Sequence, residues 1–232
     1  MLTLEGVEYV QGDFSLKADF TVQAGARVAV IGPSGGGKTT LLSMIAGFSA
    51  PTRGRVLWRG NDMAGASPGT RPVSILFQDN NLFPHLTVAQ NVGLGLRADL
   101  RLTGAQKGQV EAALVRVDLG GYWARKPAAL SGGQISRVAL ARMLLRAKPL
   151  LLLDEPFAAL GPALRDEMLD LVAELVVETK ATLLMVSHNP EDAKRIAQSV
   201  VLVSGGVADV PVETGVIFAD PPAALRAYLG GF

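Results

Sequence analysis

Cysteine is absent from this chain of 232 residues, and histidine occurs only twice, as His85 and His188. Without thiols the chain has no disulfide framework, no thiolate nucleophile, and no zinc–thiolate or iron–sulfur site held by its own cysteines. Two histidines also leave no room for a histidine-rich metal site.

Net charge and long apolar runs are lacking as well. The 22 Lys and Arg residues balance 21 Asp and Glu residues, and the net charge of +1 argues against a nucleic-acid partner bound through a broad basic surface. Apolar runs such as LLSMIAGF fall well short of the ~18–20 residues of a membrane-spanning helix. The first ten residues are acidic rather than basic, so we expect no secretory leader. Hydrophobic residues still make up 49% of the chain, which predicts a folded domain with a sizeable core.

Short apolar runs of strand length alternate with segments of helical periodicity. We predict strands over 2–10, 14–22, 27–31, 55–58, 73–77, 150–153, 182–187 and 199–203, and helices over 38–47, 162–178, 190–197 and 221–229. This alternation predicts an α/β fold with a mostly parallel, doubly wound sheet and an antiparallel β part at the N-terminus. Residues 82–147 favour helix and contain no clear strand. We therefore expect one domain over 1–232, with an α/β core from 1–81 and 148–232 and an inserted helical subdomain over 82–147.

The strongest local signal is a glycine loop between a strand and a helix, here called the phosphate loop. It consists of Gly32, Pro33, Ser34, Gly35, Gly36, Gly37, Lys38 and Thr39. Its glycines let successive N–H groups turn into one concavity, and the helix N-terminus adds the positive end of its dipole. Lys38 supplies a point charge for the β- and γ-phosphates, and the Thr39 hydroxyl is a ligand for Mg²⁺. We therefore predict binding of a nucleotide with Mg²⁺ at this loop, with Thr40 as a further member of the site.

Two adjacent carboxylates, Asp154 and Glu155, end a run of four leucines. They stand at the carboxyl end of a predicted buried strand, where α/β sheets hold their ligands. Asp154 would hold Mg²⁺ directly or through water, and Glu155 would polarise the attacking water as a general base. The alternative is that the pair merely caps the following helix. The phosphate loop favours the catalytic interpretation.

A second loop–helix junction follows Leu130 in the predicted helical subdomain. Ser131, Gly132, Gly133 and Gln134 open a predicted helix, and the spacing of Ser131 and Gln134 is typical of a capping box. The box alone explains these residues, but the same N–H groups with the Ser131 hydroxyl would also make a second phosphate cradle. Two chains placed head to tail would bring this cradle and the phosphate loop together around one nucleotide.

The order of these motifs resembles that of the ATP-binding subunits of ABC transporters, over essentially the whole chain. The resemblance implies an ATPase in which LSGGQ at 130–134 completes the ATP site of the opposite subunit. It also implies that Gln78, in LFQDNN, senses Mg²⁺ and the γ-phosphate and connects to membrane subunits. His188, after the strand TLLMVS, matches the switch histidine, which hydrogen-bonds the γ-phosphate or Glu155. His85 falls in a region near the membrane partner, although an exposed loop histidine is the simpler interpretation.

Three longer segments resemble the ATP-binding subunits of bacterial thiamine importers. These segments are RPVSILFQDNNLFPHLTVAQNVGLGL, DEPFAALGPALRDEMLDLV and TLLMVSHNPEDAKRIA. This narrower resemblance implies that two copies sandwich ATP and power import of thiamine or its phosphates through separate polytopic membrane permeases, indirectly with a periplasmic binding protein. It implies a peripheral place on the cytoplasmic face of the inner membrane. An importer for iron, molybdate, sulfate or a polyamine is the first alternative. A soluble, non-transport ATP-driven switch is the second.

The sequence departs from the family pattern at three places, the first of them just after LSGGQ, where Ile135 and Ser136 replace the more usual polar and basic pair. The loop after Glu155 usually contains an aspartate after Ser-Ala-Leu, and here Gly161 follows Ala158-Ala159-Leu160, which puts communication across the dimer in doubt. The aromatic residue that stacks on adenine aligns near Gln11, which has no ring. Tyr9 and Phe14 are the candidates for this role, and either is equally well explained as a core residue of a strand.

Overall fold

The computed structural model describes residues 1–230. The strands are β1 (Leu2–Gln11), β2 (Phe14–Val22), β3 (Arg27–Ile31), β4 (Arg53–Trp58), β5 (Asn61–Asp62), β6 (Val73–Leu76), β7 (Leu150–Asp154), β8 (Thr182–Val186), β9 (Ser199–Ser204), β10 (Val207–Ala208) and β11 (Val212–Glu213). The helices are α1 (Lys38–Ala46), α2 (Val88–Gly93), α3 (Gly104–Arg116), the 3-10 turn η1 (Pro127–Ala129), α4 (Gly132–Leu145), α5 (Pro162–Thr179), α6 (Pro190–Ile196), α7 (Thr214–Ala219) and α8 (Ala223–Tyr228).

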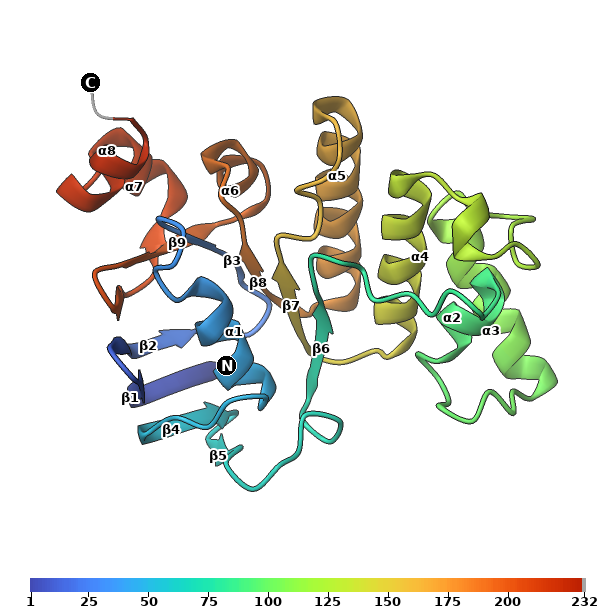
Figure 1. Cartoon of the computed structure of the whole chain (residues 1–232), viewed down its shortest axis with the longest axis horizontal. Helices are drawn as coiled ribbons and strands as arrows, with labels where there is room; N and C mark the ends of the chain where they lie inside the picture. Colours follow the sequence, from blue (N-terminus) through green and yellow to red (C-terminus); the bar gives the residue numbers. More distant parts are fainter. Residues whose placement is uncertain (231–232) are drawn as a thin grey trace.

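The strands form one mixed sheet in the order β5-β4-β1-β2-β10-β9-β3-β8-β7-β6 (Figure 1). Strands β9, β3, β8, β7 and β6 pair in parallel, whereas β2, β1, β4 and β5 pair antiparallel. The two-residue strand β10 joins these parts, because it pairs antiparallel with β9 and parallel with β2. The predicted α/β class, with a parallel core and an N-terminal antiparallel part, is confirmed.

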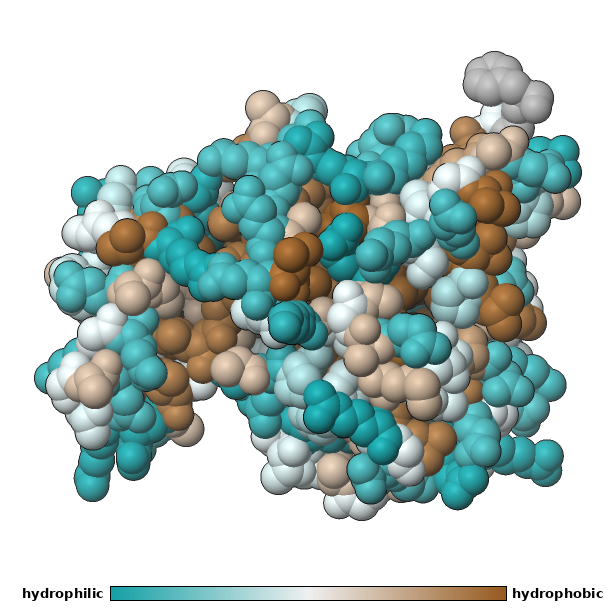
Figure 2. Space-filling view, turned by 180° about the vertical axis from the view of Figure 1, so that it is seen from behind, coloured by the Kyte–Doolittle hydropathy of each residue, from teal (hydrophilic) through white to brown (hydrophobic). Residues whose placement is uncertain are grey.

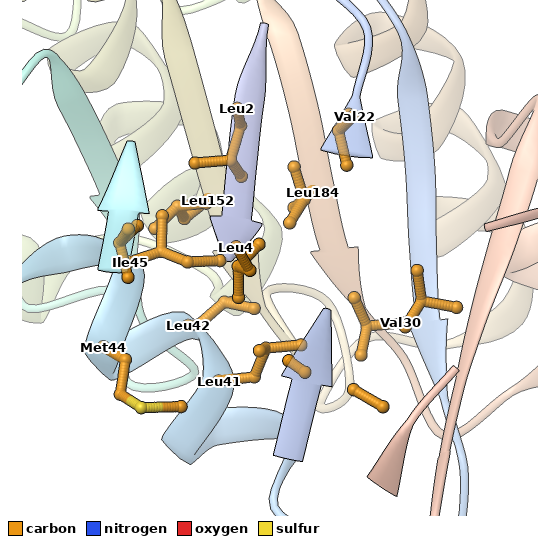
Figure 3. Close-up of a cluster of buried hydrophobic side chains, with 14 of the residues drawn as sticks. Leu2, Leu4, Val22, Val30, Leu41, Leu42, Met44, Ile45, Leu152 and Leu184 are labelled. Carbon is orange, nitrogen blue, oxygen red and sulfur yellow. The ribbon is translucent and has the colours of Figure 1, made fainter. Parts of the chain in front are cut away.

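All of strand β7 is buried because both faces of the parallel sheet are covered. Leu150 and Leu152 join a cluster with α1 and the N-terminal strands, shown in Figure 3, where side chains from β1, β7, β8 and α1 converge. Leu151 and Leu153 point to the other face and pack with residues of α4 and α5. The period of two along a strand therefore explains a run of leucines without a polar face. The same alternation places α1 on one side of the sheet and α4 and α5 on the other.

Helix α1 ends at Gly47, which adopts the left-handed conformation at φ 89° and bonds back to Ser43 and Met44. The buried guanidinium of Arg71 donates to the carbonyls of Met44 and Ile45. A Cβ on Gly47 would lie 2.5 Å from Arg71 Nε, so only glycine leaves room for this contact. Burial lowers the pKa of Arg71, but a positive charge at a helix C-terminus is favourable. The two residues fix the end of the helix that follows the phosphate loop.

Residues 82–147 contain α2, α3, η1 and α4 and, within the described chain, no strand. Helices α2, α3 and α4 share a core of their own, which includes Val88, Val92, Leu114 and Val138. Helix α4 also packs on the main sheet, through Leu140 among others. The division into an α/β core and a helical subdomain stays a prediction, and the last two residues of the predicted domain, 231–232, lie outside the described residues.

The predicted strands and helices occur within about two residues of their expected bounds, but three elements between 204 and 220 were not expected. They are β10, β11 and α7. Strands β10 and β11 are two residues long, too short to show a period of two, and they exist because each pairs with β9. Helix α7 is a single short stretch, TGVIFA, whose β-branched residues favour strand instead. Tertiary pairing, and not local preference, decides this region.

The surface seen from behind is mostly hydrophilic, with apolar residues in separate patches (Figure 2). Within the described residues, no helix is both long enough and apolar enough to span a bilayer.

Candidate functional site

The phosphate loop curls directly after β3 and ends in α1, and its glycines are required by the backbone. Gly32 has φ 144°, and a Cβ there would lie 2.0 Å from the carbonyl oxygen of Val203 in β9. Gly37 has φ 105° and is the N-cap of α1, which therefore has no side-chain cap. The first N–H groups of the helix are left for another acceptor. This geometry is that of an anion-binding helix N-terminus.

Lys38 folds back over the loop that precedes it. Its Nζ donates to the carbonyls of Gly32 at 2.8 Å and Pro33 at 2.9 Å. Burial lowers the pKa of Lys38, while the carboxylates of Glu155 and Asp154 oppose that shift. The ammonium is therefore held in place over the loop by two carbonyls, close to the two acidic residues.

A cavity of about 500 Å³ opens in front of this loop. Its lining consists of Gln11, Phe14, Ser34, Gly35, Gly37, Lys38, Thr39, Thr40 and Glu155. Residues from the N-terminal sheet, the phosphate loop and the end of β7 thus meet around one space. A larger groove of about 620 Å³, beside β10, contains neither the glycine loop nor the two carboxylates. Because polar groups converge on the cavity at the phosphate loop, this cavity is the candidate functional site.

Asp154 ends β7 at the floor of this site and contacts the phosphate loop. The Thr39 hydroxyl donates to Asp154 Oδ1 at 3.2 Å. Burial raises the pKa of Asp154, and the hydrogen bond from Thr39 works against that rise. The two oxygens are hard donors of the kind that Mg²⁺ prefers.

Glu155 lies at the edge of the cavity in a left-handed backbone conformation, with φ 46°. Only glycine adopts this region easily, so the turn after β7 carries local strain at this residue. His188 Nδ1 lies 3.1 Å from Glu155 Oε2. An ionised carboxylate at that distance requires the proton on Nδ1, which leaves Nε2 as an acceptor while the ring is neutral. The structure therefore brings together Lys38, Thr39, Asp154, Glu155 and His188.

Gln78 and the segment 131–134 are not part of this cavity. Gln78 is exposed in the turn after β6. Ser131 caps α4 in a complete capping box, because Ser131 Oγ accepts from Gln134 N and Gln134 Oε1 accepts from Ser131 N. The Ser131 hydroxyl proton and the N–H groups of Gly132 and Gly133 are left for other acceptors. Helices α1 and α4 lie on opposite sides of β6 and β7 (Figure 1).

The two aromatic candidates differ in their access to the cavity. Phe14 lines it, and a Cβ on Gly37 would lie 2.9 Å from Phe14 Cζ. Tyr9 packs edge-on against Phe14, with ring centroids 6.4 Å apart, and its hydroxyl donates to Gln11 Oε1. Tyr9 does not line the cavity. His85 stands in an exposed loop beside Phe83.

Sequence reasoning missed Arg142 and Tyr228. Arg142, in the last turn of α4, donates to the carbonyls of Asn80 and Asn81, two and three residues after Gln78. Tyr228, in α8, donates from its hydroxyl to the carbonyl of His188. Both side chains bind backbone carbonyls that are distant in the sequence, so no residue spacing in the chain predicts these hydrogen bonds.

Comparisons with known proteins identify the family of the chain. The family model described as "ABC transporter" matches residues 16–158. The protein named thiamine import ATP-binding protein ThiQ of Cereibacter sphaeroides is 60% identical over 230 residues, which cover 99% of this chain and 100% of that protein. The protein of the same name from Ruegeria sp. (strain TM1040) is 55% identical over 230 residues, again 99% of this chain and all of that protein.

Two solved structures are similar as well. The dimeric ATP-binding cassette MJ0796, in a post-hydrolysis state bound to ADP and Pi, is 27% identical with a TM-score of 0.80, and covers 92% of this chain and 99% of its own. The cbiO1 cassette from Clostridium perfringens, part of the transporter complex cbiONQ, is also 27% identical, with a TM-score of 0.84 and coverages of 99% and 94%. Fold, motif order and identity over the full length agree, and the chain belongs to the ABC transporter family as an ATP-binding subunit.

Proposed function

We propose that this chain is the Mg²⁺-dependent ATPase subunit of an importer for thiamine or its phosphates. The observation that carries the proposal is the cavity where the phosphate loop meets Glu155. The identity of 60% over nearly the full length to a thiamine import ATP-binding protein supports the choice of cargo.

Thr39 and Asp154 would hold Mg²⁺, and Gln78 would join them once the turn after β6 closes on the nucleotide. Their oxygens suit a hard cation. Among the described residues, no cluster of three or more His, Cys, Asp or Glu would hold a metal by itself. Phosphate oxygens of ATP must therefore complete the coordination. When bound, Mg²⁺ neutralises charge on the β- and γ-phosphates during phosphoryl transfer.

ATP would lie with its phosphates on the N–H groups of the phosphate loop and its adenine against Phe14. Lys38 would leave the carbonyls of Gly32 and Pro33 for the β- and γ-phosphate oxygens. Glu155 would accept a proton from water as the water oxygen forms a bond to the γ-phosphorus, while the bond from that phosphorus to the β,γ-bridging oxygen breaks and ADP leaves. His188 would hydrogen-bond the γ-phosphate or hold Glu155 in place.

Two copies of the chain would close on two ATP molecules. Because the segment 131–134 lies apart from the cavity of its own chain, its free N–H groups and the Ser131 hydroxyl would reach the γ-phosphate of the partner's ATP. The similar cassette in a dimeric state with ADP and Pi supports this arrangement. ATP would join the two chains, and hydrolysis would remove a contact that both make, so the dimer would open.

The turn at Gln78 would pass this movement to polytopic membrane permeases, with a periplasmic binding protein delivering the cargo. The chain would then sit as a peripheral subunit on the cytoplasmic face of a bacterial inner membrane. The names of the relatives, which specify import, support this location.

The test is ATP hydrolysis by this chain reconstituted with its native membrane subunits in liposomes. A purified binding protein is added, loaded in turn with thiamine, thiamine phosphates, iron, molybdate, sulfate or a polyamine. Stimulation by thiamine or its phosphates alone supports the proposal. Stimulation by another cargo would keep the ATPase and overturn the thiamine assignment, and turnover indifferent to every cargo would overturn the importer.

A further inference from the structure

The C-terminal helix α8 reaches the loop that carries His188, 40 residues earlier in the chain. The Tyr228 hydroxyl donates to the backbone carbonyl of His188. The Tyr228 ring packs on an apolar cluster that includes Ala193 of α6, Leu202 of β9 and the fully buried Leu225 of its own helix. Helices α7 and α8 lie at the same side of the molecule as α6 and β9 (Figure 1). The phenol is thus fixed to the sheet through this cluster.

The residues on either side of His188 are held by other means. Ser187 donates from its backbone N–H to Val30 and from its hydroxyl to Asp192, which also binds Arg165 of α5 at 2.6 Å. Asn189 caps α6 by accepting from the N–H of Glu191. The partners in these contacts lie in β3, α5 and α6. The carbonyl of His188 between them is held by α8 instead.

We infer that Tyr228 is a positioning residue for His188. Its hydrogen bond fixes the peptide plane that follows His188 and so keeps the imidazole over Glu155, at 3.1 Å from the carboxylate. The imidazole of His188 is about half exposed, and it contacts Glu155 from a loop. The direction of the imidazole therefore depends on the backbone of that loop. The inference rests on the proposed role of His188 in hydrolysis.

The surroundings of the phenol keep it a donor. Burial raises the pKa of Tyr228, and the nearby carboxylates of Glu155 and Asp192 raise it further. The hydroxyl therefore stays protonated at neutral pH and remains a donor to the carbonyl of His188.

The decisive variant is Tyr228→Phe, which keeps the ring on its apolar cluster and removes only the hydroxyl. Loss of one hydrogen bond of ordinary strength predicts a fall in kcat of about 3- to 10-fold. The KM for ATP should stay unchanged, because Tyr228 does not line the nucleotide cavity. The matched control is Arg226→Gln on the exposed face of the same helix, which should leave both constants as they are.

A second readout follows His188 directly. The chain has only two histidines, so His85→Gln leaves one set of imidazole NMR signals, those of His188. Adding Tyr228→Phe to this background should move these signals, and the unfolding midpoint should fall by no more than the few degrees that loss of one hydrogen bond predicts. Unmoved signals, whatever the change in the midpoint, would show a purely structural role of Tyr228 and would overturn the inference.

Double-variant kinetics separate this inference from the proposed function. If His188→Ala slows hydrolysis, adding Tyr228→Phe should lower kcat no further, because both changes act through the imidazole of His188. Additive losses, or normal kcat in Tyr228→Phe, would overturn the role of Tyr228 alone. Normal turnover in His188→Ala would instead overturn the proposed role of His188, and with it the inference that rests on that role.

Discussion

The Thr39 hydroxyl donates to Asp154 Oδ1 at 3.2 Å, across 115 residues of sequence. This bond joins the start of α1 to the end of β7, two elements that pack together on one face of the sheet. It places the phosphate loop and the paired carboxylates in one site. The groups that the proposed phosphoryl transfer requires are thereby held close together, and positioning of this kind supplies much of the rate of such reactions.

Lys38→Ala should reduce ATP hydrolysis by at least about 100-fold, because it removes the point charge aimed at the phosphates. The change also frees the carbonyls of Gly32 and Pro33, which now accept from Nζ. Binding of a fluorescent ATP analogue and steady-state phosphate release measure the two effects. Lys107→Ala, on the exposed face of α3, is the matched control. Near-normal turnover in Lys38→Ala would contradict the assignment of the phosphate loop.

Glu155→Gln should keep ATP binding and lower kcat by about 100-fold or more, since an amide cannot accept the proton of the attacking water. ATP that is not hydrolysed should hold two chains together. Size-exclusion chromatography with light scattering, with ATP and Mg²⁺ present, should then show a dimer. Glu174→Gln on the exposed side of α5 controls for the loss of charge. A variant that still turns over at nearly the wild-type rate excludes Glu155 as the base.

The parallel core and the phosphate loop could be predicted because each depends on residues that are neighbours in the sequence. A run such as Leu150–Leu153 fits a strand buried on both faces, and the positive φ of Gly32, Gly35 and Gly37 favours glycine at these positions of the loop. The contacts of Arg142 and Tyr228 could not be predicted. Each of these side chains binds a backbone carbonyl more than 35 residues away, and a carbonyl belongs to every residue type.

Phe14→Leu should weaken ATP binding about 10-fold, whereas Tyr9→Leu should have a much smaller effect. Stacking of a base on an aromatic ring contributes about 1–3 kcal/mol. Phe14 lines the nucleotide cavity, whereas Tyr9 contacts Phe14 and does not line the cavity. Competition between ATP and a fluorescent nucleotide measures both affinities. A larger loss in Tyr9→Leu would reverse the assignment of the stacking residue.

Arg142→Lys should uncouple the chain from its membrane partner and leave hydrolysis by the isolated chain within about twofold. The planar guanidinium binds the carbonyls of Asn80 and Asn81 together, both at 2.8 Å, and an ammonium cannot reproduce that fork. Both asparagines have positive φ, so the turn after Gln78 needs this support. We expect cargo-dependent stimulation in liposomes to fall about 5-fold, which lies within the usual range of coupling energies. Full stimulation would show that the movement does not pass through this contact.

Gly161→Asp should restore communication between the two ATP sites of the dimer. Gly161 is the N-cap of α5, with φ −64° and ψ 158°, and a Cβ there would meet nothing within 4 Å. Aspartate therefore fits without strain and would also cap α5, for a gain of a few tenths of a kcal/mol. The Hill coefficient for ATP should rise, because the added carboxylate would face the partner chain in the proposed dimer. Gly161→Ala, which fits the same space without a carboxylate, should leave the coefficient unchanged. If both variants raise it equally, the loss of glycine and not the gain of charge sets the coupling.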